Sequence, residues 1–148
     1  MKKVLDSIYE KYKSPEYLQT DPIQIPRGYS DPRDIEISGL ITALFSYGNV
    51  NSILAHLKKL FFLFGTSPAE FFSNEKNIIK IQDKLPYYRF QKSEDIYLFF
   101  LILCEFWKKS FTLEYLFGPG DNNTQTRIRK FQKSFLDSAR KKTEISPG

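Results

Sequence analysis

Acidic side chains gather at one predicted helix start, and they are the first group in this 148-residue sequence that could do chemistry. Asp31, Asp34 and Glu36 stand together beside Arg33. Carboxylates in such a cluster can hold a metal ion or act as a general base. The same residues suit helix capping, because Asp31 precedes Pro32 and acidic groups stabilise the positive end of the helix dipole. We favour capping and keep a small enzyme that uses this cluster as a third hypothesis.

Other groups that catalyse or bind metals are scarce. One His and one Cys exclude a His-rich metal site, a zinc site built from Cys and a disulfide framework. We expect His56 to be a partly buried helix residue and Cys104, in the most apolar stretch, to be an inert core residue. No Ser-His-Asp, Cys-His or dinucleotide-binding pattern is present. We therefore predict no catalytic residue, no metal and no cofactor.

An aromatic and basic segment follows Pro86 and precedes a predicted helix start. Tyr87, Tyr88 and Arg89 in this segment could stack on nucleobases or pair with a phosphate. The segment could equally be a loop clamped over the core, with Arg89 bound to carbonyl oxygens. We favour the clamp, and the residues leave both interpretations open.

The charge of the chain is uneven along its length. The net charge is +5, and the whole excess lies in residues 108–148, where 9 Lys and Arg face 4 Asp and Glu. A final helix over residues 124–142 is predicted to turn its basic residues away from an apolar stripe; these are Arg127, Arg129, Lys130, Lys133, Arg140, Lys141 and Lys142. Such a face can neutralise the phosphates of DNA. A solvated outer face of a peripheral helix is the more common alternative.

Helical spacing of apolar residues dominates the chain, and no segment shows strand-like alternation. Apolar residues make up 41% of the sequence and charged residues 26%, which is a globular composition. The fold class is predicted to be all-α, a single multi-helix domain over residues 1–148 with about seven or eight helices. Residues 19–33 are predicted to form a long Pro-rich surface loop in extended conformation, and residues 143–148 a tail.

The predicted helix over residues 31–47 has two different faces. Large residues such as Ile37 and Ile41 take one wide face, and the small residues Gly39, Ala43 and Ser46 take much of the other. Small residues let a second helix approach closely. We therefore expect this helix to be central and buried on both sides.

Membrane and secretion signals are weak. Lys2 and Lys3 resemble the charged start of a signal peptide, but charged residues interrupt the sequence directly after them. The longest uncharged run, residues 37–57, could span a bilayer by length but holds many polar residues. We expect a soluble, cytoplasmic protein with no membrane partner.

Several motifs resemble the opening signature of an uncharacterised bacterial family of unknown function. They are Asp21-Pro22-Ile23, Pro26, Tyr29-Ser30, residues 32–37 and residues 43–49. Tyr88-Arg89-Phe90 is similar to a second motif of that family. The resemblance covers most of residues 1–107. One departure is visible, because Arg27-Gly28 stands where the family would have a His after Pro26.

The N-terminal half also bears a distant likeness to the helix-hairpin-helix DNA glycosylases, and the fold is expected to resemble the N-terminal helical part of those enzymes. Tyr47 and Asn49 lie where those enzymes have a loop that faces the DNA minor groove, although its glutamines are absent here. The Tyr88-Arg89 segment is similar to their aromatic-Arg motif. The resemblance and the charge pattern together give eight candidate nucleic-acid-binding residues: Tyr47, Asn49, Tyr88, Arg89, Arg127, Arg129, Lys130 and Lys133.

The resemblance implies that other members of the family are longer, with a C-terminal part where glycosylases carry a Gly-rich hairpin, an Asp and sometimes a Lys. This chain stops about where that part would begin, as a natural short form, a frameshifted product or a truncated one. We therefore expect no glycosylase catalysis from it. The first hypothesis is a non-catalytic module that contacts nucleic acid; the alternative is a helical interaction or structural fragment that self-associates or awaits a partner.

Overall fold

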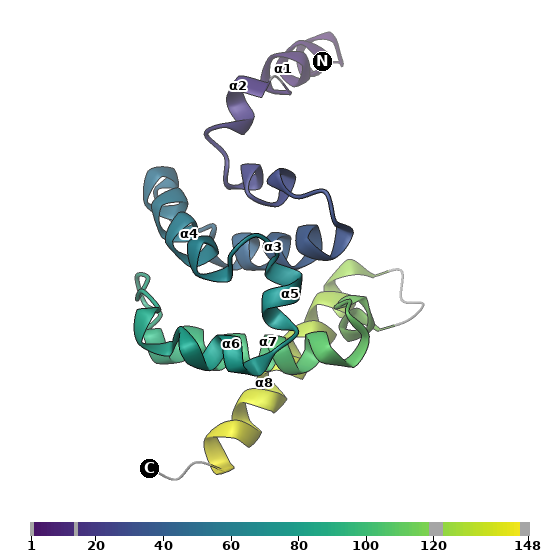
Figure 1. The fold of residues 1–148 in the computed structure, drawn as a ribbon. Coiled ribbons are helices and arrows are strands. Elements are labelled where there is room, and N and C mark those ends of the chain that lie inside the picture. Colours follow the sequence, from purple (N-terminus) through teal and green to yellow (C-terminus); the bar gives the residue numbers. More distant parts are fainter. Residues whose placement is uncertain (1, 14, 119–122, 146–148) are drawn as a thin grey trace. The chain divides into compact units, whose positions relative to one another are not determined.

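The computed structural model describes residues 2–13, 15–118 and 123–145, and these residues form an all-α structure (Figure 1). They hold eight α-helices and four short 3-10 helices, and their one isolated β-bridge joins Tyr88 and Gln91. The all-α class and the expected number of helices are confirmed for the described residues. The chain divides into two compact units, Met1–Phe62 and Leu63–Gly148, and each is described by itself.

The first unit is centred on the helix α3. In chain order it holds α1 (Lys2–Tyr12), α2 (Pro15–Leu18), the 3-10 helices η1 (Pro22–Gln24) and η2 (Pro26–Gly28), α3 (Pro32–Phe45) and most of α4 (Val50–Phe64). Both 3-10 helices pack on α3. The central helix and these two turns therefore form the frame of the unit.

The start of α3 follows from its sequence. The Asp31 carboxylate accepts the backbone N–H of Arg33 at 2.8 Å, and Pro32 occupies the first turn, where a missing N–H costs nothing. Ile37, Ile41 and Phe45 lie on its buried face, with at most 2% of their surface exposed. The face that carries the small residues is not buried as expected. Ala43 and Leu44 are exposed, and a Cβ added at Gly39 would meet nothing within 4 Å. Among the described residues of this unit, the elements opposite Gly39 are the two 3-10 helices, and they do not approach it as closely as the small residues would allow.

The Pro-rich segment is not an extended loop. Pro22 and Pro26 each begin a turn of 3-10 helix, and Pro22 is buried. Proline fixes φ near the value of a helical first turn, so it starts short helices as readily as it interrupts long ones. The Asp21 carboxylate accepts the N–H of Ile23 at 2.8 Å and caps η1.

The second unit is built on the long buried helix α7. Its elements are α5 (Pro68–Phe72), α6 (Glu75–Lys80), η3 (Gln82–Lys84), α7 (Ser93–Ser110), η4 (Glu114–Phe117) and α8 (Thr124–Ile145). Phe100, Leu103 and Trp107 of α7 are fully buried, and the Trp107 ring donates its N–H to the carbonyl oxygen of Ala69 at 3.0 Å. Phe72 and Phe100 pack edge to face at 5.3 Å. The predicted core helix is confirmed.

Side chains fix the start of α7. The Ser93 hydroxyl donates to the carbonyl oxygen of Leu85, and the Asp95 carboxylate accepts the N–H of Lys92. The last helix continues to Ile145, three residues beyond the predicted end. Residues 119–122, between η4 and α8, and the end of the predicted tail, residues 146–148, lie outside the described residues.

Helix length and polarity also bear on membranes. Among the residues that the structure describes, no helix is both long enough and apolar enough to cross a bilayer.

Candidate nucleic-acid interface

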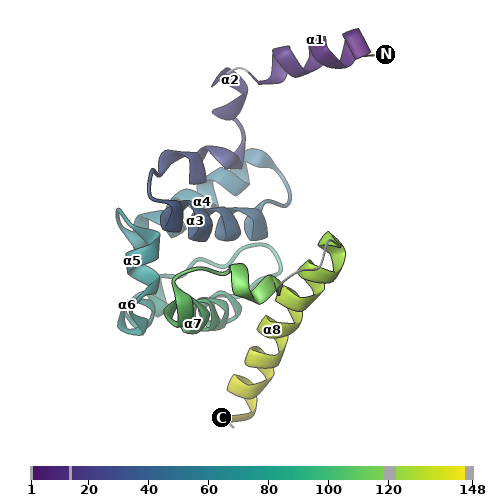
Figure 2. The same ribbon diagram turned by 90° about the vertical axis from the view of Figure 1, so that its right-hand side faces the viewer.

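The inner face of α8 is held by aromatic rings. Phe131 stacks on Phe117 of η4 with ring centroids 4.7 Å apart, and Phe135 contacts Phe99 and Phe106 of α7 at 5.3 and 5.0 Å. Figure 2 shows α8 crossing α7 beside η4. Ile128, at the start of the predicted stripe, is 45% exposed. These contacts fix which side of α8 faces the protein and which faces outward.

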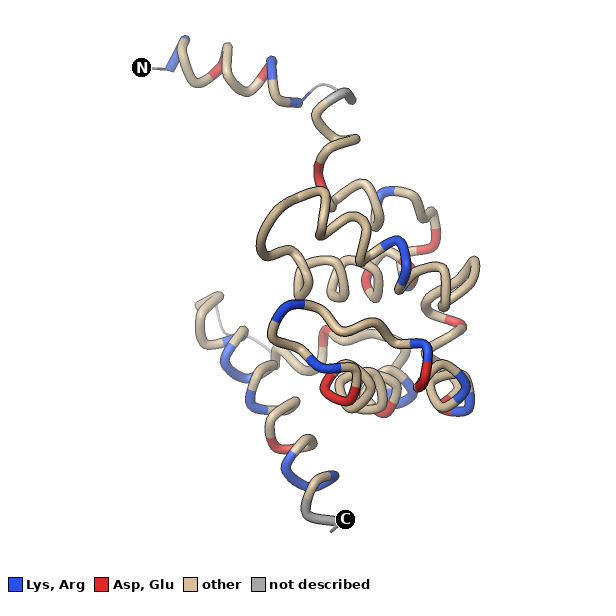
Figure 3. The backbone as a smooth tube through the Cα atoms, turned by 90° about the vertical axis from the view of Figure 1, so that its left-hand side faces the viewer, with Lys and Arg blue, Asp and Glu red and all other residues tan. Residues whose placement is uncertain are grey.

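Three basic residues follow one line on the outward side of α8. Arg129, Lys133 and Arg140 are all exposed, and their spacings of four and seven residues place them on one face of a helix. None of the three has an ion pair with a described residue. Figure 3 shows how Lys and Arg recur along α8. We call Arg129, Lys133 and Arg140 the basic stripe.

The other two predicted residues of α8 are placed differently. Arg127 is half-buried, and its Nε is enclosed without a hydrogen-bond partner among the described residues. The side chain of Lys130 lies against Gly118, with its Nζ 3.3 Å from where a Cβ on that glycine would be. Both side chains are thus turned toward the protein. Arg140 was not among the eight candidate residues, but it belongs to the basic stripe.

The remaining charges on α8 include the exposed Lys141, one ion pair with α7 and one acid. Lys142 pairs with Glu105 of α7 at 3.4 Å, which ties the end of α8 to the core helix. Asp137 lies four residues after Lys133 and three before Arg140, so its carboxylate adds negative charge beside the basic stripe.

The segment before α7 forms a tight turn. Tyr88 and Gln91 exchange two backbone hydrogen bonds of 2.9 Å, and Arg89 between them has a positive φ of 55°. The ring of Tyr88 is only 6% exposed and belongs to the core, as expected for a loop clamped over it. Arg89 is exposed. The rings that this turn presents outward are Tyr87 and Phe90, 78% and 90% exposed.

The final candidate set left out Tyr87 and Phe90, the two exposed rings. Alternation in an extended segment could have indicated Tyr87, because it is next to the buried Tyr88. It could not have indicated Phe90, which is two residues from Tyr88 and is exposed because the chain turns at Arg89, where φ is positive.

Tyr47 and Asn49 lie in the other unit, between α3 and α4. Asn49 caps α4, because its side-chain oxygen accepts the N–H groups of Asn51 at 3.0 Å and Ser52 at 3.4 Å. Gly48 has a positive φ of 108°, which makes the tight turn possible. Tyr47 is half-buried. Tyr47 and Asn49 thus belong to the first unit, whereas the other six candidate residues belong to the second.

The acidic cluster acts at the start of α3. Asp31 both caps the helix and pairs with Arg33 at 2.8 Å, and these hydrogen bonds lower the pKa of the Asp31 carboxyl. Asp34 is buried at 7% exposure, and together with burial it raises the pKa of Tyr29. Within the described residues, no group of three or more His, Cys, Asp and Glu side chains could hold a metal ion.

The single His and the single Cys are both buried, at 6% and 1% exposure. His56 packs on Phe45 with centroids 4.9 Å apart, and burial together with Lys59 lowers its pKa to about 4. Burial raises the pKa of Cys104, so the thiol is poorly ionised and unreactive, as expected for a core residue.

One family model matches the chain. It is described as "Protein of unknown function (DUF2400)" and covers residues 21–147, so the chain belongs to this family. The expected membership of a family of unknown function is thus confirmed, and the match extends beyond the expected region to include α8. No curated protein and no solved structure matches the chain.

Proposed function

We propose that this chain contacts the phosphate backbone of nucleic acid through the basic stripe of α8. The observation that carries the proposal is the alignment of three exposed cations on the side of α8 that faces away from its aromatic packing, each without an ion pair to a described residue. Arg129 and Arg140 are about 16 Å apart along the helix axis, a length of about five nucleotide steps of one DNA strand. The proposed contact is with phosphates and not with base edges.

The affinity expected of such a contact is modest and depends on salt. Each neutralised phosphate releases counterions, so three contacts give a slope of about −2.7 in log affinity against log salt concentration. Between about 50 and 200 mM salt, this corresponds to a loss of about 40-fold. Non-specific attachment to duplexes of any sequence is the expected behaviour.

The test is fluorescence anisotropy with a labelled DNA duplex and two triple variants. Changing Arg129, Lys133 and Arg140 to Ala is expected to weaken binding at least about tenfold at about 50 mM salt. The matched control changes Lys76, Lys80 and Lys84 to Ala. These lysines are exposed and lie in the same unit, and their substitution removes the same number of positive charges. Equal weakening by both variants would show that only net charge matters and would contradict the proposed interface.

The glycosylase-like character of the module is the finer part of this proposal, and it is motivated by the resemblance of residues 44–49 and 88–90. It predicts that Tyr47 and Arg89 add to duplex binding. Arg89→Gly removes the side chain at a position whose positive φ glycine accepts, and Arg89→Lys keeps the charge. Tyr47→Ala and Arg89→Gly are expected to weaken duplex binding several-fold; unchanged affinity in both would contradict the glycosylase-like arrangement.

Self-association is the second candidate function, and one observation favours it. Val4, Leu5, Ile8 and Tyr9 of α1 share a helix face and are each between 48% and 65% exposed. An exposed apolar face on a helix is typical of a partner surface. In an antiparallel pair of α1 helices, Lys3 would stand near Glu10 of the other copy, which adds charge complementarity.

The oligomeric state measured by light scattering tests this candidate. The chain is expected to form dimers whose fraction rises with concentration, and Leu5→Glu together with Ile8→Glu should leave a monomer. Ser7→Glu, on the polar side of α1, is the control and should leave the dimer intact. A monomeric wild-type chain at all concentrations would contradict self-association.

A further inference from the structure

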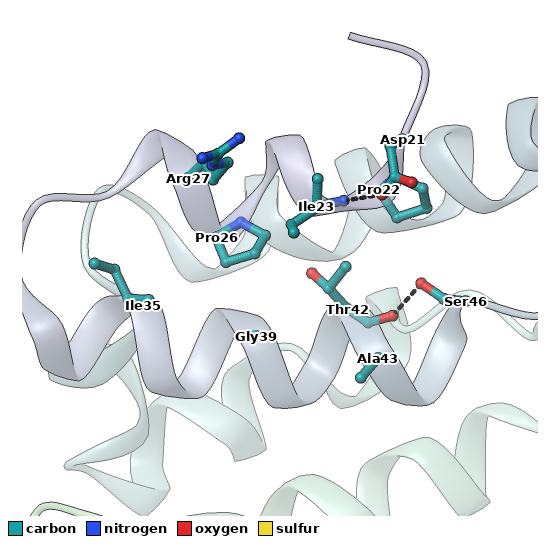
Figure 4. A pocket seen from close by; sticks show the side chains of 10 residues that line it. All are labelled: Asp21, Pro22, Ile23, Pro26, Arg27, Ile35, Gly39, Thr42, Ala43 and Ser46. Carbon is teal, nitrogen blue, oxygen red and sulfur yellow. Dashed lines mark hydrogen bonds between the residues drawn. The ribbon is translucent and has the colours of Figure 1, made fainter. Parts of the chain in front are cut away.

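A pocket of about 540 Å³ lies in the first unit, between α3 and the two 3-10 helices (Figure 4). Pro22, Ile23 and Pro26 line it from η1 and η2, and Ile35, Gly39 and Thr42 line it from α3. Its volume falls in the range of pockets that hold small molecules. Every lining residue belongs to residues 21–46, so the pocket is complete within one unit.

The walls of the pocket are mainly apolar, and they remain accessible. Ile23 is 46% exposed and Ile35 41% exposed, although both are large apolar side chains that would normally be covered. Two charged residues of opposite sign also line it, Asp21 and Arg27, and both are exposed. Their formal charges cancel, so the lining favours neither a cationic nor an anionic ligand.

One buried polar group in the pocket has no partner. Thr42 is 5% exposed, and its Oγ1 has no hydrogen-bond partner among the described residues. Figure 4 shows this side chain directed from α3 toward η1 and η2. Other hydroxyls of the helix are satisfied locally, since Ser38 donates to the carbonyl oxygen of Ile35 and Ser46 to that of Thr42. A buried hydroxyl without a partner is uncommon and calls for a ligand or a water.

Gly39 keeps the floor of the pocket open. A Cβ at this position would meet nothing within 4 Å, so a side chain could extend into the space. Glycine is a poor residue for the middle of a helix, and nothing in its backbone conformation here requires it. Alanine would suit the helix better at position 39, yet glycine stands there and leaves the pocket open.

We propose that this pocket binds a small, mainly apolar, neutral molecule that forms one hydrogen bond with the hydroxyl of Thr42. The apolar walls shield the side of the ligand that faces them from water, and the single buried hydroxyl fixes its orientation. An analogue without the polar group leaves Thr42 unpaired and gains less from binding. This site is separate from the basic stripe of α8, and its test is independent of nucleic-acid binding.

The experiment uses indole and phenol as probes, with indene and toluene as the matched molecules that lack the polar group. Binding to the ¹⁵N-labelled chain is followed by NMR. Indole and phenol are expected to shift the amide signals of Gly39, Thr42 and Ala43 at millimolar concentration, and to bind several-fold more tightly than indene and toluene. No shift of these signals by either polar probe would overturn the proposal.

Three variants assign the binding to the pocket. Gly39→Leu fills the space and should weaken indole at least tenfold, with Gly39→Ala as a smaller change that should weaken it several-fold. Gly28→Leu is the matched control, because its Cβ also meets nothing within 4 Å but the residue does not line the pocket. Thr42→Val should weaken indole and leave indene unchanged. Unaltered indole binding by both Gly39 variants, or by Thr42→Val, would overturn the proposal.

Discussion

At the scale of single residues, His56 makes the folding stability of the first unit depend on pH. Its imidazole is buried against Phe45, and burial lowers its pKa to about 4 from an ordinary value of 6.5. The unfolded chain therefore binds a proton between these two values that the folded chain does not bind. Folding stability is complete above pH 6.5 and falls as the pH drops toward 4.

The prediction is a loss of about 2 kcal/mol in the free energy of unfolding between pH 7 and pH 5 through this one residue. It is measured by urea unfolding of the wild type and of His56→Gln, which does not titrate. The variant is expected to lose most of this pH dependence while remaining folded. Parallel pH profiles for the two proteins would show that His56 is readily protonated in the folded state.

At the scale of elements, the sequence predicted those features that depend only on residues adjacent in the chain. The start of α3 was predictable because Asp31, Pro32 and Arg33 are neighbours, and capping involves only neighbours. The pocket was not, because its walls come from Pro22 and Pro26 as well as α3, and only tertiary packing brings them together. The expectation that small residues let a second helix approach closely was wrong at Gly39, because η1 and η2 leave the pocket there.

In the candidate interface, too, one part was predictable from the sequence and another part was not. Helical periodicity predicts the side of α8 that carries the cations, but it does not show which of them turn back onto the protein. Lys130 lies beside Gly118, a tertiary contact that the helix itself does not indicate. Arg127 is half-buried and stands four residues before Phe131, so its spacing places it on the packed side. The burial of Tyr88 is likewise a tertiary effect, since its neighbours Tyr87 and Phe90 have similar chemistry and are exposed.

The acid beside the basic stripe gives a prediction at this scale. Asp137 lies within one turn of Lys133 and Arg140, so its negative charge opposes the approach of phosphates. Asp137→Asn is expected to strengthen binding to a DNA duplex by about two- to fivefold at low salt, an effect that shrinks as salt rises. Asp83→Asn, in η3 of the same unit, is the control. An equal gain from both changes would point to net charge and away from a local site.

At the scale of the whole molecule, charge is distributed to favour the second unit as the partner of polyanions. Residues 63–148 carry 14 Lys and Arg against 10 Asp and Glu, whereas residues 1–62 carry 8 against 7. The isoelectric point near 9.2 keeps the chain positive at neutral pH, and a net positive charge favours encounter with polyanions in general.

The most direct measurement is the slope of log affinity for a DNA duplex against log salt concentration, compared between the wild type and the variant that changes Arg129, Lys133 and Arg140 to Ala. If these side chains neutralise three phosphates, the variant's slope is shallower by about 2.7, and the slope of the Lys76, Lys80 and Lys84 control stays close to that of the wild type. Binding that is absent, or whose slope is the same in all three proteins, would contradict a nucleic-acid interface on α8.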